Sequence, residues 1–117
     1  MKDELDKALK ELAELYDFYI DIAELPAEEM VEKIEERDPE FIEHIEAMEN
    51  PPQSGDDFWF GYGIWSMSRL HSKYRPIWGE LIDAYFHSDV RRQQREKWSL
   101  SSAIWTKIDE ILKNSDF

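Results

Sequence analysis

Apolar residues in the first fifty positions recur at alternating steps of four and three, the period of one face of an α-helix. The clearest run consists of Leu5, Leu9, Leu12, Tyr16, Tyr19 and Ala23. This spacing predicts an amphipathic helix over residues 3–24. Pro26 ends that helix and suits the first turn of a second one, where its missing N–H costs nothing. Asp38 followed by Pro39 is a second start signal, which predicts a third helix there.

The second half of the chain has a different pattern. Turn-forming residues are dense from position 50 onward, and we place a linker at residues 51–57. Residues 58–65 are apolar on all sides, so periodicity does not decide between a buried helix and a short irregular or strand segment near 58–63. Helical spacing continues from Trp65 to Tyr85, with Pro76 expected to kink or split the run. A last helix is expected over residues 89–113.

Taken together, these elements predict an all-α protein, a compact bundle of five or six helices. The length of 117 residues suits a single domain, and 42% hydrophobic residues suffice for a core. We divide this domain, residues 1–117, into an acidic helical half at 1–50, the linker at 51–57 and an aromatic-rich helical half at 58–117.

Charge separates the two halves more sharply than hydropathy does. Residues 1–50 contain 18 Asp and Glu against five Lys and Arg, which accounts for the whole net charge of −13. Residues 51–117 contain nine acids, nine bases and all five tryptophans. Because net charge governs association and solubility more than fold, this asymmetry indicates a basic partner.

The acids fall at helical spacing and therefore form stripes. At 1.5 Å rise per residue, each stripe presents a carboxylate about every 5–6 Å. Between Ala13 and Pro51 the only bases are Lys33 and Arg37, although a face built for solubility would intersperse more lysines. Two interpretations stay open, a docking surface for a basic partner and a merely solvated surface. The stripe residues are Glu14, Asp17, Asp21 and Glu24, then Glu29, Glu32 and Glu36, then Glu40 and Glu43.

Composition limits the function classes further. Without cysteine the chain has neither disulfides nor thiolate metal sites, and we expect no cofactor and no bound metal. An isoelectric point near 4.5 argues against direct binding to nucleic acid or an anionic membrane. No signal peptide is visible and the longest apolar stretch is too short to span a bilayer, so a cytoplasmic location is expected. We expect a monomer or a small homo-oligomer.

Aromatic and basic residues of the second half have their own expected places. We expect the tryptophans and residues 58–62 to be mainly core, with one or two residues, by preference Trp59 or Tyr62, exposed beside the acidic helices as anchors. The basic run at residues 91–98 is expected to pair with the acidic helices inside the bundle or to be solvated.

Signals for enzyme chemistry are weak, and we expect no catalytic residues. The histidines lie far apart, and neither a nucleophile elbow nor a phosphate-binding glycine loop is present. One arrangement stands as an alternative. Two carboxylate motifs, Glu28-Glu29-x-x-Glu32 and Glu80-x-x-Asp83, resemble the paired motifs with which all-α nucleoside-triphosphate pyrophosphohydrolases hold Mg²⁺. Here the second motif comes much later in the chain than in that family.

A local resemblance concerns residues 43–60. The segments His44-Ile45-Glu46-Ala47-Met48-Glu49-Asn50-Pro51 and Gly55-Asp56-Asp57-Phe58-Trp59-Phe60 are similar to part of the colicin-type nuclease immunity proteins. In that family an acidic helix and an adjacent tyrosine pair grip a basic toxin domain. The resemblance implies that Glu43, Glu46 and Glu49 are acidic contacts and that Trp59 and Phe60 take the place of the tyrosines.

The sequence therefore predicts a small acidic binding protein that inhibits or masks a basic protein, such as a nuclease or another nucleic-acid-binding protein. Tyr62 is included with Trp59 and Phe60 among the expected aromatic contacts. Two alternatives remain: a helical scaffold or oligomerisation module with an aromatic interface, and the Mg²⁺-dependent pyrophosphohydrolase.

Overall fold

Six α-helices and one 3₁₀ turn make up most of the described chain, which in this computed structural model comprises residues 2–23, 25–51, 55–97 and 110. The elements are α1 (Lys2–Ala23), α2 (Ala27–Arg37), α3 (Pro39–Glu46), α4 (Gly55–Lys73), η1 (Arg75–Ile77), α5 (Trp78–Phe86) and α6 (Asp89–Lys97). Within those ranges no residue belongs to a strand. The prediction of an all-α bundle of five or six helices is confirmed.

Prolines set several helix boundaries as expected. α2 begins directly after Pro26, and Asp38 separates α2 from α3, which starts at Pro39. Pro76 lies in η1 and splits the run that the spacing joined from Trp65 to Tyr85.

The predicted linker at residues 51–57 and the segment at 58–63 differ more from the prediction. α4 begins at Gly55, so the last three residues of the expected linker are helical. Acids in a first turn complement the helix dipole, which explains why two aspartates can follow Gly55 there. Residues 58–63 are helical and not a strand. They are apolar on all sides because α4 packs against both α1 and α2.

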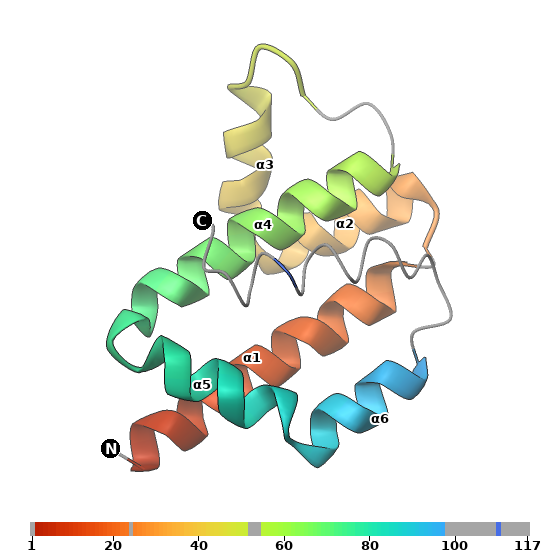
Figure 1. The fold of residues 1–117 in the computed structure, drawn as a ribbon. Helices are drawn as coiled ribbons and strands as arrows, with labels where there is room; N and C mark the ends of the chain where they lie inside the picture. Colours follow the sequence, from red (N-terminus) through yellow and green to blue (C-terminus); the bar gives the residue numbers. More distant parts are fainter. Residues whose placement is uncertain (1, 24, 52–54, 98–109, 111–117) are drawn as a thin grey trace.

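α1 is the central helix of the bundle (Figure 1). It contacts α2 and α4 on one side and α5 and α6 on the other. Its apolar face is broad enough for both because large side chains are fully buried along its length. The buried residues are Ala8, Leu12, Leu15, Tyr16, Tyr19 and Ile22.

A buried polar network joins α1 to α4. The Tyr19 hydroxyl lies 2.6 Å from Ser66 Oγ, and Ser66 Oγ donates a hydrogen bond to the Tyr62 carbonyl at 2.7 Å. Trp59 Nε1 donates to the Tyr19 carbonyl at 3.0 Å. Burial of the Tyr19 hydroxyl raises its pKa well above the usual tyrosine range. The side chains at this contact are thus buried with their polar groups satisfied, which fixes how α1 and α4 pack.

α2 and α3 are attached to α4 at one aromatic site. The Phe41 ring packs edge-on against Phe58 and Tyr62, with centroids 5.5 and 5.3 Å away, and lies 5.3 Å from the Trp65 ring. Next to this cluster the Tyr62 hydroxyl donates to Asp38 Oδ2 at 2.5 Å. Both the helix junction and the first turn of α3 are therefore held against α4, while α3 rises steeply from the layer below it (Figure 1).

α6 is held to α1 and α5 by polar side chains. Arg91 is only 5% exposed, and its guanidinium lies over the Tyr16, Tyr85 and Phe86 rings at 5.6, 5.4 and 4.5 Å. Gln94 is also buried; its amide donates to the Ala13 carbonyl and its oxygen accepts from Tyr85.

The expectation for the basic run is therefore met only in part. Arg92 pairs with Asp89 of the same helix at 2.9 Å, and Arg95 is exposed. Arg91, however, packs on aromatic faces, a favourable arrangement for a guanidinium. The residues expected to form the rest of the last helix lie outside the described chain, apart from residue 110, which is helical.

Candidate functional site

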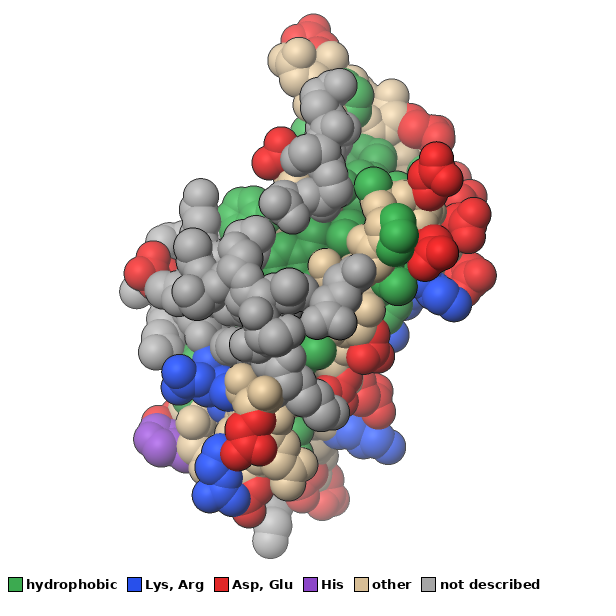
Figure 2. Space-filling model, turned by 90° about the vertical axis from the view of Figure 1, so that its right-hand side faces the viewer, with side chains coloured by type: hydrophobic (Ala, Val, Ile, Leu, Met, Phe, Trp, Pro, Cys, Tyr) green, Lys and Arg blue, Asp and Glu red, His purple; other side chains and the backbone are tan. Residues whose placement is uncertain are grey.

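The acidic surface of the molecule is concentrated on α2, α3 and the residues that follow them. We call residues 27–50 the acidic limb. Every glutamate of this limb is exposed, and in Figure 2 acidic side chains gather along the right-hand edge of the molecule. These glutamates are Glu28, Glu29, Glu32, Glu35, Glu36, Glu40, Glu43, Glu46 and Glu49.

Few of these carboxylates are neutralised by a base. Lys33 lies 3.9 Å from Glu36, and Arg69 of α4 bonds Glu40 at 2.8 Å. Within the part of the chain that the structure describes, the other seven glutamates of the limb form no ion pair. Like charges at helical spacing repel one another, so the limb retains an uncompensated negative field.

The other predicted acidic residues that the structure describes lie on α1, outside the acidic limb. Glu14, Asp17 and Asp21 are exposed, whereas Glu24 lies outside the described residues. Asp17 accepts a hydrogen bond from Gln94 of α6 at 3.1 Å. Glu14 lines a groove on the other side. The α1 stripe therefore runs between that groove and α6.

The expected exposure of Trp59 and Tyr62 is wrong. Trp59 is 4% exposed and Tyr62 is fully buried, because both rings fill the space between α1, α3 and α4. Phe60 is half-buried against the core. Their expected role in the core is confirmed for this part of the chain, and no exposed aromatic anchor comes from Trp59 or Tyr62.

The acidic limb also exposes one large apolar side chain, Met48. It is 44% exposed and lies just after α3, between the exposed Glu46 and Glu49. Ile45, one turn earlier, is half-buried. A flexible apolar side chain among carboxylates is suited to contact the aliphatic stems of a partner's lysines and arginines.

The two carboxylate motifs of the pyrophosphohydrolase alternative are not assembled into a metal site. Glu28, Glu29 and Glu32 lie on α2, and Glu80 and Asp83 lie on α5. Among the described residues, no three or more acids, histidines or cysteines come close enough together to hold a metal ion. This alternative receives no support from the arrangement.

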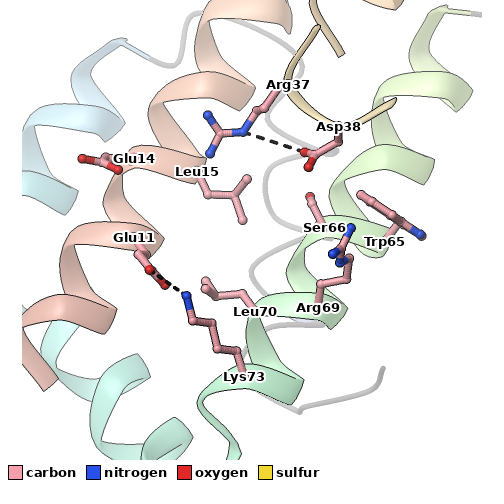
Figure 3. Close-up of a pocket in the computed structure, with 10 residues that line it drawn as sticks. All are labelled: Glu11, Glu14, Leu15, Arg37, Asp38, Trp65, Ser66, Arg69, Leu70 and Lys73. Carbon is pink, nitrogen blue, oxygen red and sulfur yellow. Dashed lines mark hydrogen bonds and ion pairs between the residues drawn. The ribbon is translucent and has the colours of Figure 1, made fainter. Parts of the chain in front are cut away.

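A groove of about 480 Å³ separates α1 from α4 below the α2–α3 junction (Figure 3). Glu11, Glu14 and Leu15 line it from α1, whereas Arg37 and Asp38 line it from the junction. The α4 side consists of Trp65, Ser66, Arg69, Leu70 and Lys73. Figure 3 shows one ion pair at each end of this groove, Glu11 with Lys73 and Arg37 with Asp38.

The ion pair between Glu11 and Lys73 affects both groups. Lys73 Nζ lies 2.9 Å from Glu11 Oε1. Burial alone would raise the pKa of Glu11, but its interactions with Lys73 and Tyr74 and the charge of Lys7 together outweigh burial and lower this pKa. The hydrogen bond with Glu11 also raises the pKa of Lys73. Both groups therefore stay charged at neutral pH.

Sequence reasoning missed this groove and two of the acids on α2. Glu28 and Glu35 are seven residues apart and lie beside the predicted stripe, so helical spacing alone could have added them. The groove depends on which turn of α1 faces which turn of α4. No local pattern reveals that register.

Comparison with known proteins returns no similarity: the chain matches no family model, no curated protein and no solved structure. The resemblance of residues 43–60 to the nuclease immunity proteins stays a prediction. In the part of the chain that is described, no helix is both long and apolar enough to cross a membrane.

Proposed function

We propose that this chain is a small acidic binding protein that inhibits or masks a basic, nucleic-acid-binding protein. The observation that carries the proposal is the acidic limb, whose nine glutamates are all exposed and mostly without a basic neighbour. A protein surface that normally contacts phosphates would find a comparable row of negative charges there.

Charge spacing supports this choice of partner. Carboxylates on one helix face recur about every 5–6 Å. Phosphates along a nucleic-acid strand carry negative charge at a similar few-ångström spacing. A nuclease or another protein that binds nucleic acid presents lysines and arginines arranged for such a row. Electrostatic steering would then raise the association rate and make the affinity depend on salt.

Contact with such a partner would involve more than charge. Met48 offers an apolar contact among the acids of the acidic limb. Glu43, Glu46 and Glu49, the contacts implied by the immunity-protein resemblance, are exposed around it. These residues form the part of the limb that we assign to the centre of the interface.

A competition experiment tests the proposal. Basic nucleases and a histone-like protein are each bound to a labelled DNA duplex, and the acidic protein is titrated into the complexes at about 50 mM and about 200 mM salt. We expect release of the duplex from at least one partner, with a lower affinity at the higher salt concentration.

Failure to displace DNA from every member of the panel at the lower salt concentration would contradict the masking function. Sedimentation of the protein alone distinguishes the masking function from the scaffold alternative. We expect a monomer or a small homo-oligomer that leaves the acidic limb exposed, whereas a stable homo-oligomer that buries this limb would favour a scaffold.

A further inference from the structure

The helix α5 has apolar surface outside the face that it packs into the core against α1. Gly79, Ile82 and Phe86 follow one another at helical spacing and line a hollow of about 440 Å³, with Asp83 and His87 beside them. All five residues belong to α5 or directly follow it, so the described chain supplies only one wall of this hollow. The opposite wall has to come from another molecule.

Gly79 is a residue that its own fold does not require. Apart from the backbone of α5 and its two chain neighbours, no described atom lies within 4 Å of the place where a Cβ would stand. Glycine is also among the least favourable residues in a helix. The fold would therefore accept a side chain at this exposed position, whereas glycine lets a second backbone approach α5 closely.

Apolar side chains around the hollow are incompletely covered. Ile82 and Phe86 are half-buried against the core. Val90 follows in the first turn of α6 and is 43% exposed. Apolar surface that remains uncovered in this way is typical of a protein–protein contact.

Charge identifies the molecule that fits this face. Residues 78–97, which contain α5 and α6, carry four acids and four bases, whereas the acidic limb carries ten acids and two bases. Asp83 lies 3.5 Å from His87, and Asp89 pairs with Arg92 at 2.9 Å. A basic protein is therefore attracted to the limb and not to this face. A second copy of the chain, with its net charge of −13, meets the least repulsion here.

We propose that two copies of this chain form a symmetric dimer through α5 and the start of α6, with the two α5 helices crossing at Gly79. In a symmetric interface the same strip of each copy supplies the wall that the other copy's hollow lacks. α5 and α6 lie on the other side of α1 from α2, so both acidic limbs stay exposed (Figure 1). The dimer is independent of the proposed function, and either can be correct without the other.

Sedimentation of the full chain from about 1 μM to about 1 mM tests the dimer. We expect a monomer–dimer equilibrium that strengthens as salt is added, because salt screens the repulsion between two molecules of net charge −13. Binding of a basic partner to the limb should weaken with salt, so the two proposals respond in opposite directions. A chain that stays monomeric throughout this range at high salt would overturn the dimer.

Gly79→Gln tests the position of the interface. The added side chain should raise the dissociation constant of the dimer at least about tenfold, because it occupies the space of the second helix. It should not lower the unfolding temperature of the dilute monomer, since glutamine is the better helix former. The control Ala27→Gln extends a small exposed side chain on α2 and should leave the dimer unchanged. Equal dimerisation of the two variants would overturn the interface, and a loss with Ala27→Gln alone would place the contact on the limb.

Cross-linking gives a second test that does not depend on weakening the dimer. The chain has no cysteine, so Gly79→Cys and Ala27→Cys each introduce a single thiol. A crossing at Gly79 brings the two Cα atoms within the roughly 4.4–6.8 Å that a disulfide needs. Under mild oxidation we expect Gly79→Cys to form a disulfide-linked dimer at least about tenfold faster than Ala27→Cys. Equal rates for the two variants would contradict the crossing at Gly79.

Discussion

The acidic limb and the bundle of α1, α4 and α5 are both helical, but different interactions hold them. In the bundle, buried aromatic rings and hydrogen bonds connect neighbouring helices, as with Tyr19 and Ser66. The limb buries only Met30, Ile34 and Phe41 and exposes every glutamate. Where packing is thin, the surface is free to carry charge at little cost in stability.

This contrast indicates a division of roles. Mutations in the bundle should change stability, whereas mutations of the limb's glutamates should change association with little effect on stability. The predictions below test that division, beginning with Phe41, a limb residue that packs against the bundle.

Phe41→Ala should have the largest effect on stability. The ring is 2% exposed and inserts from the limb between three aromatic rings of α4. Its removal should lower the free energy of unfolding by about 3–5 kcal/mol in chemical denaturation. The neighbouring Ile42 is half-buried, and Ile42→Ala should cost clearly less. Equal losses would contradict the assignment of Phe41 as the attachment point of the limb.

Tyr19→Phe should destabilise the bundle by about 1–3 kcal/mol, because it removes the buried hydrogen bonds of the Tyr19 hydroxyl with Ser66 Oγ and the Gly63 carbonyl. Denaturation of Tyr19→Phe, Ser66→Ala and the double variant measures this coupling. We expect the double variant to lose less than the sum of the single variants. Strict additivity would show that the two hydroxyls do not act together.

Arg91→Met should lower the free energy of unfolding by about 0.5–2 kcal/mol, because the cation loses its contacts with three aromatic faces. The matched control is Arg92→Met on the same helix, which is exposed and should stay within about 0.5 kcal/mol of the parent. A larger loss for Arg92 than for Arg91 would refute this account of α6.

Acid should remove the contribution of the pair between Glu11 and Lys73. The folded-state pKa of Glu11 is lowered, so this contribution is present above the usual glutamate value of 4.5 and disappears as pH falls through the folded pKa. Because both side chains are partly exposed, we expect this contribution to stability to be small. Unfolding measured against pH should show this loss in the parent but not in Glu11→Gln. Parallel profiles for the two proteins would contradict it.

The smallest effect on stability is expected from the acidic limb itself. The combined variant Glu29→Gln, Glu32→Gln and Glu43→Gln removes repulsion between like charges and breaks no ion pair within the described residues. Its free energy of unfolding should stay the same or rise by roughly a few tenths of a kcal/mol. A clear destabilisation would show that these glutamates support the fold, against the proposed division.

Local patterns predicted the helices well because periodicity and proline act within a few residues. Pro39 and Pro76 mark boundaries that the structure confirms. The start of α4 was missed because Gly55 and the two aspartates after it serve equally in a turn or a first helical turn. Whether an aromatic ring is buried or exposed was harder still to predict, since Trp59 and Tyr62 are buried by helices that are distant in sequence.

The candidate sites likewise comprise features that local patterns predict and features that depend on contacts between distant helices. Acidic stripes depend on spacing within one helix, and the exposed glutamates of α2 and α3 follow from it. The burial of Arg91 and the groove between α1 and α4 depend on how α1 meets α6 and α4. Such contacts between distant segments leave no local signal in the sequence.

The most direct test of the central claim compares two variants of equal charge. One carries the three substitutions Glu29→Gln, Glu32→Gln and Glu43→Gln; the control carries Asp3→Asn, Asp6→Asn and Glu80→Gln, which are exposed positions outside the acidic limb. Affinity for the basic partner found by DNA displacement is measured for both at about 100 mM salt. We predict at least a tenfold loss for the limb variant and nearly parental affinity for the control. Equal losses in the two variants would contradict the acidic limb as the binding surface.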